Sequence, residues 1–257
     1  MLDKITYEFL ESVDSTNERI KALAREDREQ GLVISADTQT AGKGRIGRKW
    51  ETPKRDTIAT SILLRPTDIP IESVPTITII GAMAVRKALE VVCGIQSEIK
   101  WPNDIVIDGK KICGILTEME MRDGRVWYVV CGIGVNVHNR DFPEEIAFKA
   151  TSVDIELEKI QSKAHSSRKE ITKAIWEYFK EYYNIFVRTA DLSALKEEYE
   201  RHLANIGKAV RIEAQENSYE AIAKGITIQG ELIVEVDGQE QIIRTGEVSV
   251  RGIYGYS

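Results

Sequence analysis

Cysteine and histidine are scarce in this chain, and their spacing excludes two common kinds of site. The three cysteines are an odd number and no pair is spaced C-x-x-C, so neither a disulfide framework nor a thiolate zinc site is expected. The three histidines are scattered along the 257 residues, so a histidine-based metal site is not expected either. The sequence therefore indicates a protein of a reducing compartment, the cytoplasm, without a structural metal.

Long apolar runs are missing as well. No stretch approaches the ~20 apolar residues that cross a bilayer, and the first 14 residues lack the apolar segment of a signal peptide. Apolar residues nevertheless make up 42% of the chain and charged residues 30%, as in a globular protein. We expect no membrane attachment, and either one large domain or a domain of about 200 residues plus a small one.

Positive charge is in deficit, yet it is concentrated in one place. The 35 lysines and arginines against 41 acidic residues leave a net charge of −6, which argues against a general DNA- or RNA-coating protein. Residues 42–55 alone carry +5, so the rest of the chain carries −11. This dense basic loop in an acidic chain is the feature that the function has to explain.

Apolar periodicity predicts four helices. The first should begin with a capping box, in which the Ser15 hydroxyl accepts a hydrogen bond from the Glu18 N–H, and should end near Gly31. The other three are expected at residues 71–93, 169–188 and 192–207. Residues 139–167 are polar and are predicted to be irregular.

Short β runs account for much of the remainder. Strands are expected at residues 32–36, 57–64, 105–107, 112–116 and 126–130. The last three form a meander, because Asp108-Gly109 and Asp123-Gly124 are two-residue hairpin signals. About five short strands follow Gly207. The predicted fold is therefore α+β, with a small all-β barrel appended.

The basic loop, residues 42–50, reads GKGRIGRKW. Gly42, Gly44 and Gly47 match the dinucleotide pattern G-x-G-x-x-G, but no amphipathic helix follows, which argues against a Rossmann fingerprint. Glycines let backbone N–H groups approach a polyanion whose charge the basic side chains balance, as a nucleoside triphosphate requires. The alternatives are a solvated basic surface loop and a nucleic-acid contact, of which the acidic remainder disfavours the second.

A second basic segment begins the strand after the Asp108-Gly109 turn. Lys110 and Lys111 are consecutive, and consecutive strand residues point to opposite faces. We assign the site-facing position to Lys111, because the apolar run 112–115 follows it and a lysine there can stabilise charge on a phosphate or carboxylate. The alternative is that both lysines only solubilise the hairpin.

Two neighbouring segments have unusual compositions. Residues 101–104, WPND, contain Asn103 and Asp104, for which the alternative to a site is a turn that bonds its own backbone. Residues 132–137 form an apolar strand with two glycines, and glycine inside a strand often marks the close approach of a ligand or another backbone. Asn136 can donate and accept, which suits an adenine edge, the alternative being an edge-strand bulge followed by an asparagine turn.

Taken together, these segments resemble those of the biotin protein ligases of the BirA family. The resemblance covers nearly the whole chain and is carried by six blocks in order: STN at 15–17, QTAGKGRIGRKW at 39–50, KWPNDI at 100–105, KKICGIL at 110–116, GIGVN at 132–136 and the C-terminal barrel. It implies a catalytic domain over residues 1–206, with a mixed β-sheet and flanking helices like those of class II aminoacyl-tRNA synthetases. Residues 207–257 would form an SH3-like β-barrel.

The resemblance also implies a two-step reaction and its partners. Biotin's carboxylate attacks the α-phosphate of ATP, with Mg²⁺, to give biotinyl-5′-adenylate and pyrophosphate, and biotin then passes to a lysine of a biotin carboxyl carrier protein. That carrier would belong to acetyl-CoA carboxylase or another biotin-dependent carboxylase, and family members are often homodimers through sheet edges. The basic residues fit this chemistry, because two anions must meet where water is excluded.

The family's functional residues carry over to matching positions. The implied biotin contacts are Ser15, Thr16, Asn17, Gln39, Lys43, Gly44, Arg45, Lys111 and Gly114. The implied ATP and adenylate contacts are Lys43, Arg45, Arg48, Trp50, Lys111 and Asn136. The implied catalytic residues are Lys111, Arg48, Arg45 and Asp104. Hydroxyls and amides suit the uncharged ureido group of biotin, which both donates and accepts hydrogen bonds.

Two features depart from the family pattern. Lys43 stands where the family's loop usually has arginine, which keeps the charge but loses the bidentate fork. The Ser-Thr-Asn motif begins at residue 15, which leaves no room for the winged helix-turn-helix of repressor members, so we expect no direct DNA binding. A lipoate or other acyl ligase and a non-catalytic biotin-binding regulator are the alternative functions. Gln39 with the basic loop argues against the first, and Lys111 with Arg48 against the second.

Overall fold

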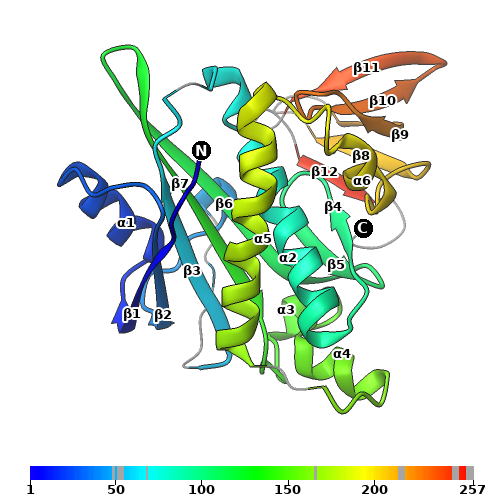
Figure 1. The fold of residues 1–257 in the computed structure, drawn as a ribbon. Coiled ribbons are helices and arrows are strands. Elements are labelled where there is room, and N and C mark those ends of the chain that lie inside the picture. Colours follow the sequence, from blue (N-terminus) through cyan, green and yellow to red (C-terminus); the bar gives the residue numbers. More distant parts are fainter. Residues whose placement is uncertain are drawn as a thin grey trace.

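Two β-sheets organise the structure, a large one flanked by helices and a small one formed by the C-terminal segment (Figure 1). The computed structural model describes residues 1–47, 50, 55–67, 69–164, 167–213, 218–244 and 249–252. Helices flank a mixed sheet, so the predicted α+β class is confirmed. Within the described ranges no helix is long and apolar enough to span a membrane.

The large sheet has seven strands in the order β1-β2-β3-β7-β6-β5-β4. They are β1 (Thr6–Val13), β2 (Leu32–Gln39), β3 (Thr57–Leu64), β4 (Glu98–Lys100), β5 (Asp104–Ile107), β6 (Lys110–Arg122) and β7 (Arg125–Asn136). β1 runs parallel to β2 and the other neighbours are antiparallel. The predicted meander is confirmed as β5, β6 and β7, with Asp108 and Asp123 in left-handed conformation at its two turns.

Two strands are not predicted by the apolar pattern. β1 is an edge strand whose Tyr7 and Phe9 are exposed, so its alternation does not separate a core face from a solvent face. β4 has three residues, too few for a period of two to be recognised.

Four α-helices of the described ranges correspond to predicted ones and differ from them at their ends, whereas two lie in residues 139–167, where the prediction of irregular structure was wrong. They are α1 (Thr16–Arg25), α2 (Thr76–Cys93), α3 (Glu144–Ala147), α4 (Val153–Lys159), α5 (Arg168–Thr189) and α6 (Lys196–Arg201). The prediction of helix from residue 71 was wrong at its start: Ile71–Ser73 is a separate 3-10 turn and α2 begins after Pro75, whose ring has no N–H to extend a helix backward. α6 covers only the middle of the predicted 192–207 helix, and residues 139–167 contain the short α3 and α4.

The capping box predicted for α1 is wrong. Ser15 takes the extended N-cap conformation, but its side chain makes no capping hydrogen bond. The Glu18 carboxylate turns away from the cap and bonds the ammonium groups of Lys21 and Lys43. The helix also stops at Arg25 rather than near Gly31, and Asp27 just beyond its end has φ 57°.

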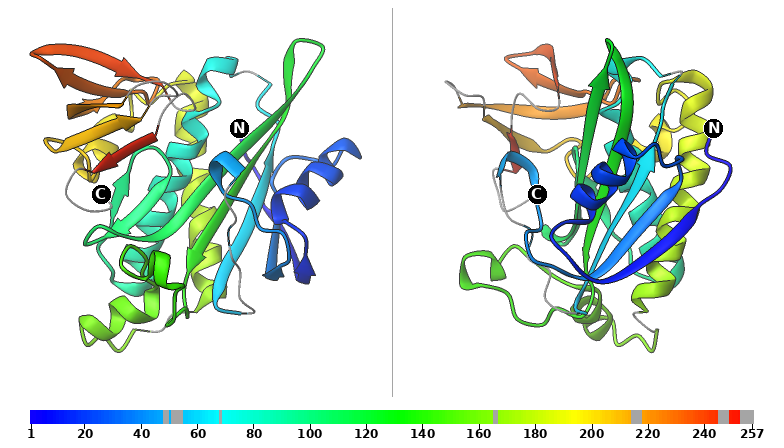
Figure 2. Two further views of the ribbon diagram at one scale, coloured as in Figure 1. Left: turned by 180° about the vertical axis from the view of Figure 1, so that it is seen from behind. Right: turned by 90° about the vertical axis from the view of Figure 1, so that its left-hand side faces the viewer.

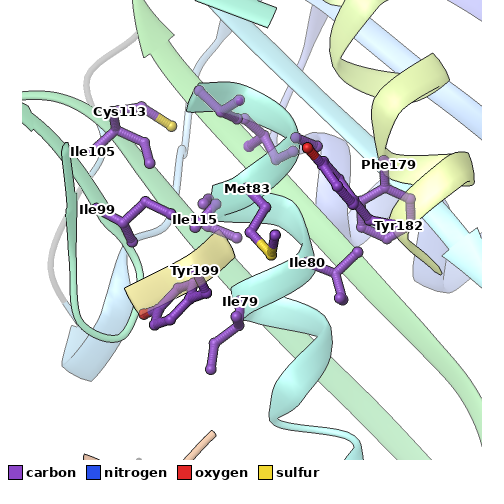
Figure 3. Packing of buried hydrophobic residues seen from close by; sticks show 14 of the residues in the cluster. Ile79, Ile80, Met83, Ile99, Ile105, Cys113, Ile115, Phe179, Tyr182 and Tyr199 are labelled. Atoms are coloured by element: carbon purple, nitrogen blue, oxygen red, sulfur yellow. The ribbon is translucent and has the colours of Figure 1, made fainter. Parts of the chain in front are cut away.

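Strand alternation gives the large sheet an apolar cluster on each face. α2 and α5 pack on one face, where Met83 and Phe179 lie in the core (Figure 3). α1 packs on the other face through residues such as Ile20 (Figure 2). On β7, Val129 belongs to the first cluster and its neighbour Val130 to the second. Because α1 is short, part of its face of the sheet stays uncovered, and the candidate site lies there.

The C-terminal segment forms a separate antiparallel sheet of five strands. They are β8 (Ala209–Glu213), β9 (Ser218–Ile226), β10 (Leu232–Val236), β11 (Gln239–Ile243) and β12 (Ser249–Gly252), in the order β11-β10-β9-β8-β12. The predicted small β domain is confirmed, whereas in the described part no pairing joins β11 to β12 to close a barrel. Buried Trp101 donates from Nε1 to the Gly230 carbonyl, 2.9 Å away, and so links this sheet to the larger unit.

A buried charge cluster ties β2 to α5 and gives a pH-dependent prediction. Asp37, 5% exposed, accepts hydrogen bonds from Arg168 and, at 3.2 Å, from Arg55. Burial raises the pKa of Asp37, but the hydrogen bonds and charges of Arg168 and Arg55 outweigh this and hold it below the ordinary value. A depressed pKa in the folded state stabilises the protein above the unfolded pKa of about 3.9, and this contribution is lost as the pH falls further.

We therefore expect Asp37→Asn to lower the free energy of unfolding by about 2 kcal/mol at pH 7, because it leaves Arg168 without its counter-charge. The difference from wild type should shrink when urea unfolding is repeated near pH 3. Asp141→Asn, at an exposed position, serves as the matched control and should not change the free energy of unfolding at either pH. A difference that stays the same at both pH values would contradict the role of the Asp37 charge.

Candidate active site

An open pocket lies where the N-terminus of α1 meets β3, β6, β7 and the basic loop. The space in it, including the part that is open to solvent, amounts to about 460 Å³. Its lining residues are Ser15, Thr16, Asn17, Gln39, Lys43, Gly44, Arg45, Trp50, Ala59, Asn103, Lys111, Gly114, Ile115, Leu116, Gly132, Ile133 and Gly134. Most of the site residues predicted from the sequence are therefore brought together in one cavity.

One end of the pocket is a network of uncharged hydroxyls and amides. The Thr16 N–H donates to Gln39 Oε1 at 2.8 Å, which joins the start of α1 to the end of β2. Ser61 Oγ on β3 lies 2.7 Å from Thr16 Oγ1 and 2.6 Å from Asn17 Oδ1. Because an amide oxygen can only accept, the single Ser61 proton goes to Asn17. Ser61 is fully buried and is a site residue that the sequence reasoning missed.

Glycines on β6 and β7 make room for the side chains of this end and of the basic loop. Gly132 lies so close to Asn17 that a Cβ there would be 2.1 Å from Oδ1. Gly134, paired with Gly114 on β6, lies under the Trp50 indole, where a Cβ would be 2.5 Å from Cε2. The strand glycines were predicted to mark the close approach of a ligand or another backbone, whereas the structure shows the side chains of Asn17 and Trp50 against them, so an approach by a ligand stays a prediction.

The other end of the pocket is charged. Lys111 Nζ lies 2.6 Å from Asp104 Oδ1 and 5.6 Å from the centre of the Trp50 ring. The backbone of Lys111 is held by residues 149–151, donating to the Lys149 carbonyl and accepting from the Thr151 N–H. Lys111 also pairs with Val106 of β5, so its side chain projects from a backbone that two segments fix.

Asn103 holds the loop arginine at this end. Arg45 Nη1 donates to Asn103 Oδ1 at 2.7 Å. Asn103 is itself fixed to β6. Its side-chain Nδ2 donates to the Ile115 carbonyl, and its backbone carbonyl accepts from the Ile115 N–H. Asn103 and Asp104 thus bond other segments of the site, and sequence reasoning gave Asn103 no role.

The basic loop is closed at its base and attached to α1. The Trp50 N–H donates to the Gly42 carbonyl at 3.0 Å. Lys43 Nζ lies 2.6 Å from Glu18 Oε1, and the hydrogen bonds from Lys43 and Lys21 lower the pKa of Glu18. Lysine at position 43 therefore makes a single-point ion pair with the helix rather than a bidentate contact.

Of the predicted site residues that the structure describes, Asp104 and Asn136 do not line the pocket. Arg48 lies outside the described residues. Asp104 accepts a hydrogen bond from Lys111, which does line the pocket. Asn136 is buried at the end of β7, where its Nδ2 donates to the Thr151 carbonyl at 3.0 Å, so its contact with adenine stays a prediction. In the part of the chain that the structure describes, no group of three or more His, Cys, Asp or Glu residues could hold a metal ion.

Comparisons with known proteins match both units of this chain. Residues 9–136 match the family model of the biotin/lipoate A/B protein ligase family, and residues 206–251 match that of the biotin protein ligase C-terminal domain. The bifunctional ligase/repressor BirA of Bacillus spizizenii is 37% identical over 226 residues, which cover 87% of this chain and 67% of that protein. The biotin–[acetyl-CoA-carboxylase] ligase of Mycobacterium tuberculosis is 30% identical over 242 residues, 91% of this chain and 85% of that protein.

A solved structure agrees over almost the whole length. The biotin protein ligase from Aquifex aeolicus, in complex with biotin and ATP, aligns with a TM-score of 0.80 and 30% identity. The alignment covers 96% of this chain and 98% of that one. On identity, coverage and fold, the chain belongs to the biotin protein ligase family.

Proposed function

We propose that the chain is an ATP-dependent biotin protein ligase that acts in two steps. In the first, a biotin carboxylate oxygen bonds to the α-phosphorus of ATP and pyrophosphate leaves, giving biotinyl-5′-adenylate. In the second, a lysine amine of a biotin carboxyl carrier protein attacks the carbonyl of this mixed anhydride and AMP leaves. The observation that carries the proposal is one pocket with an uncharged amide–hydroxyl end at Asn17 and a cationic end at Lys111.

The two ends match the two ends of biotin. The ureido ring needs partners that both donate and accept, and the side chains of Thr16, Asn17 and Gln39 supply them without a net charge. The carboxylate needs cations, and Lys111 and Arg45 line the opposite part of the pocket. Gly114 brings the backbone of β6 close to the Lys111 side chain, so nothing bulky separates the strand from that ammonium group.

The cationic end also fits phosphoryl chemistry. Lys111 would stabilise the charge that develops on the α-phosphate, and Asp104 would keep its ammonium group in place. The loop residues Lys43 and Gly44, with Arg48 beyond the described residues, would balance the phosphates and keep water from the labile anhydride. Mg²⁺ would come with the nucleotide, because a magnesium ion bound to phosphates needs only one or two carboxylates of the protein.

The nucleotide would lie beside Trp50. Its indole rests over the glycine pair of β6 and β7 and gives the flat surface that an adenylate needs. Its Nε1–H is buried and finds no acceptor within the described ranges. Asn136 is the proposed adenine contact at the end of β7.

We assign the finer features of the family to this chain in the same way. Residues 1–206 form the catalytic domain and residues 207–257 an SH3-like β-barrel. The enzyme works in the cytoplasm, as a homodimer through sheet edges, on the carrier domain of acetyl-CoA carboxylase or another biotin-dependent carboxylase.

The purified chain is expected to catalyse biotin-dependent ATP–pyrophosphate exchange with Mg²⁺, and to add one biotin to a single lysine of a carrier domain. Radiolabelled pyrophosphate measures the first step and intact-protein mass spectrometry the second. A carrier domain whose acceptor lysine is replaced by arginine is the matched control. Exchange with lipoate instead would identify a related acyl ligase, and biotin binding without exchange would identify a regulator.

A further inference from the structure

A carboxylate that no motif singled out lies directly behind the uncharged end of the pocket. Glu118, on β6, accepts a hydrogen bond from Asn17 Nδ2 through Oε2 at 2.7 Å. Its other oxygen, Oε1, lies 2.6 Å from Lys21 Nζ on the next turn of α1. Glu118 therefore joins one residue of the pocket lining to the body of the helix that carries it.

These contacts determine the orientation of the Asn17 side-chain amide. Nδ2 faces two acceptors, Glu118 Oε2 at 2.7 Å and the Leu116 carbonyl at 3.3 Å. Oδ1 faces the Ser61 hydroxyl at 2.6 Å. Turning the amide over would bring its oxygen against a carboxylate and a carbonyl, and two acceptors in contact repel. Asn17 consequently presents an oxygen, a hydrogen-bond acceptor, toward the pocket side of β7.

Lys21 keeps the carboxylate in its position. Burial lowers the pKa of Lys21, but hydrogen bonds with Glu118 and Glu18 outweigh this and leave it raised, so the ammonium group stays charged. Lys21 Nζ also lies 2.9 Å from Glu18 Oε1, the oxygen that Lys43 of the basic loop contacts. The same chain of charges thus connects the basic loop, α1 and the Asn17 amide.

We propose that Glu118 is a positioning residue for the ring-binding end of the pocket: its carboxylate, held by Lys21, orients the Asn17 amide so that Oδ1 accepts from a ureido N–H. This rests on the proposed biotin ligase function. Glu118 contacts no substrate itself and acts through Asn17. Its effect should therefore appear in the affinity for biotin and not in the affinity for ATP.

The test compares Glu118→Met, which keeps the length but removes both carboxylate oxygens, with Glu118→Gln, which can still accept from Asn17. In the full-length protein, Glu118→Met should raise the Kd for biotin, measured calorimetrically without ATP, about tenfold. The KM for ATP and the rate of adenylate formation at saturating biotin should stay within about twofold of wild type. Glu118→Gln should recover most of the lost affinity.

Glu120→Gln is the matched control. Glu120 lies two residues along β6 and also makes an ion pair with α1, through Arg25 at 2.6 Å, but it does not contact Asn17. It should leave the Kd for biotin unchanged. If Glu120→Gln raised the Kd for biotin as much as Glu118→Met does, biotin affinity would depend on α1–β6 ion pairs in general. That result would overturn the proposal.

Other results would overturn the positioning role of Glu118 or the proposed function itself. An unchanged Kd in a folded Glu118→Met protein, or an equal rise in the KM for ATP, would overturn the positioning role. If Glu118→Met does not fold, Lys21→Met replaces it, with an expected rise of about threefold in the Kd and no rise as the contradicting result. A wild-type protein that does not bind biotin would instead refute the proposed function, which separates the two failures.

Discussion

Lys111→Ala is expected to slow biotinyl-adenylate formation about a thousandfold while weakening biotin binding far less. In the resting site the Lys111 ammonium already has a counter-charge, Asp104 Oδ1 at 2.6 Å. A bound carboxylate therefore shares this ammonium group with Asp104, so Lys111 contributes less to binding than to the chemical step. Negative charge then builds on the α-phosphate as the new bond forms. An ammonium group fixed nearby stabilises this transition state more than it stabilises the bound substrates.

The measurement is a single-turnover experiment. Labelled ATP and saturating biotin give the rate of adenylate formation, and equilibrium binding gives the biotin Kd separately. Lys110→Ala is the matched control, because Lys110 is the adjacent residue on β6 and does not line the pocket. Equal losses of rate and affinity in Lys111→Ala would make Lys111 a binding residue and contradict its role in the chemical step.

The elements that sequence reasoning predicted well are those with a strong local signal. β6 and β7 contain apolar runs joined by an Asp-Gly turn, and both strands and the turn occur, although β6 runs well beyond the predicted 112–116 and β7 joins the strands predicted at 126–130 and 132–137 into one. α2 and α5 have apolar residues at helical spacing over many turns, and only their ends differ from the prediction. β1 was missed because it is an edge strand, where Phe9 is exposed and no burial pattern constrains the sequence.

The site shows a different limit. The motifs predicted which segments converge, because glycines, cations and amides cluster within each segment. They did not identify Ser61 or Glu118 and gave Asn103 no specific role, because these roles come from contacts between segments far apart in the chain. Ser61 had one usable signal, a small hydroxyl inside the strongly apolar strand β3. The Ser15 prediction failed for the same reason, since a local capping pattern cannot show that Glu18 pairs with Lys43.

Gly132→Ala and Gly134→Ala are expected to damage different ends of the pocket. A Cβ at position 132 would lie 2.1 Å from Asn17 Oδ1, and one at position 134 would lie 2.5 Å from Trp50 Cε2. Neither neighbour can stay in place, and a displaced side chain loses its proposed contact with the substrate, which costs about tenfold to a hundredfold in affinity. Gly132→Ala should therefore raise the KM for biotin, whereas Gly134→Ala should raise the KM for ATP.

Steady-state exchange kinetics with each substrate varied in turn separate the two effects. Gly124→Ala is the control on the same hairpin: a Cβ there meets nothing within 4 Å, although φ is +74°. It should lower thermal stability through backbone strain and leave both KM values unchanged. If both pocket variants raised the two KM values equally, the glycines would serve only to hold β6 and β7 together. If Gly132→Ala raised only the KM for biotin and Gly134→Ala only the KM for ATP, one glycine would make room for the amide that faces biotin and the other for the indole that faces the nucleotide.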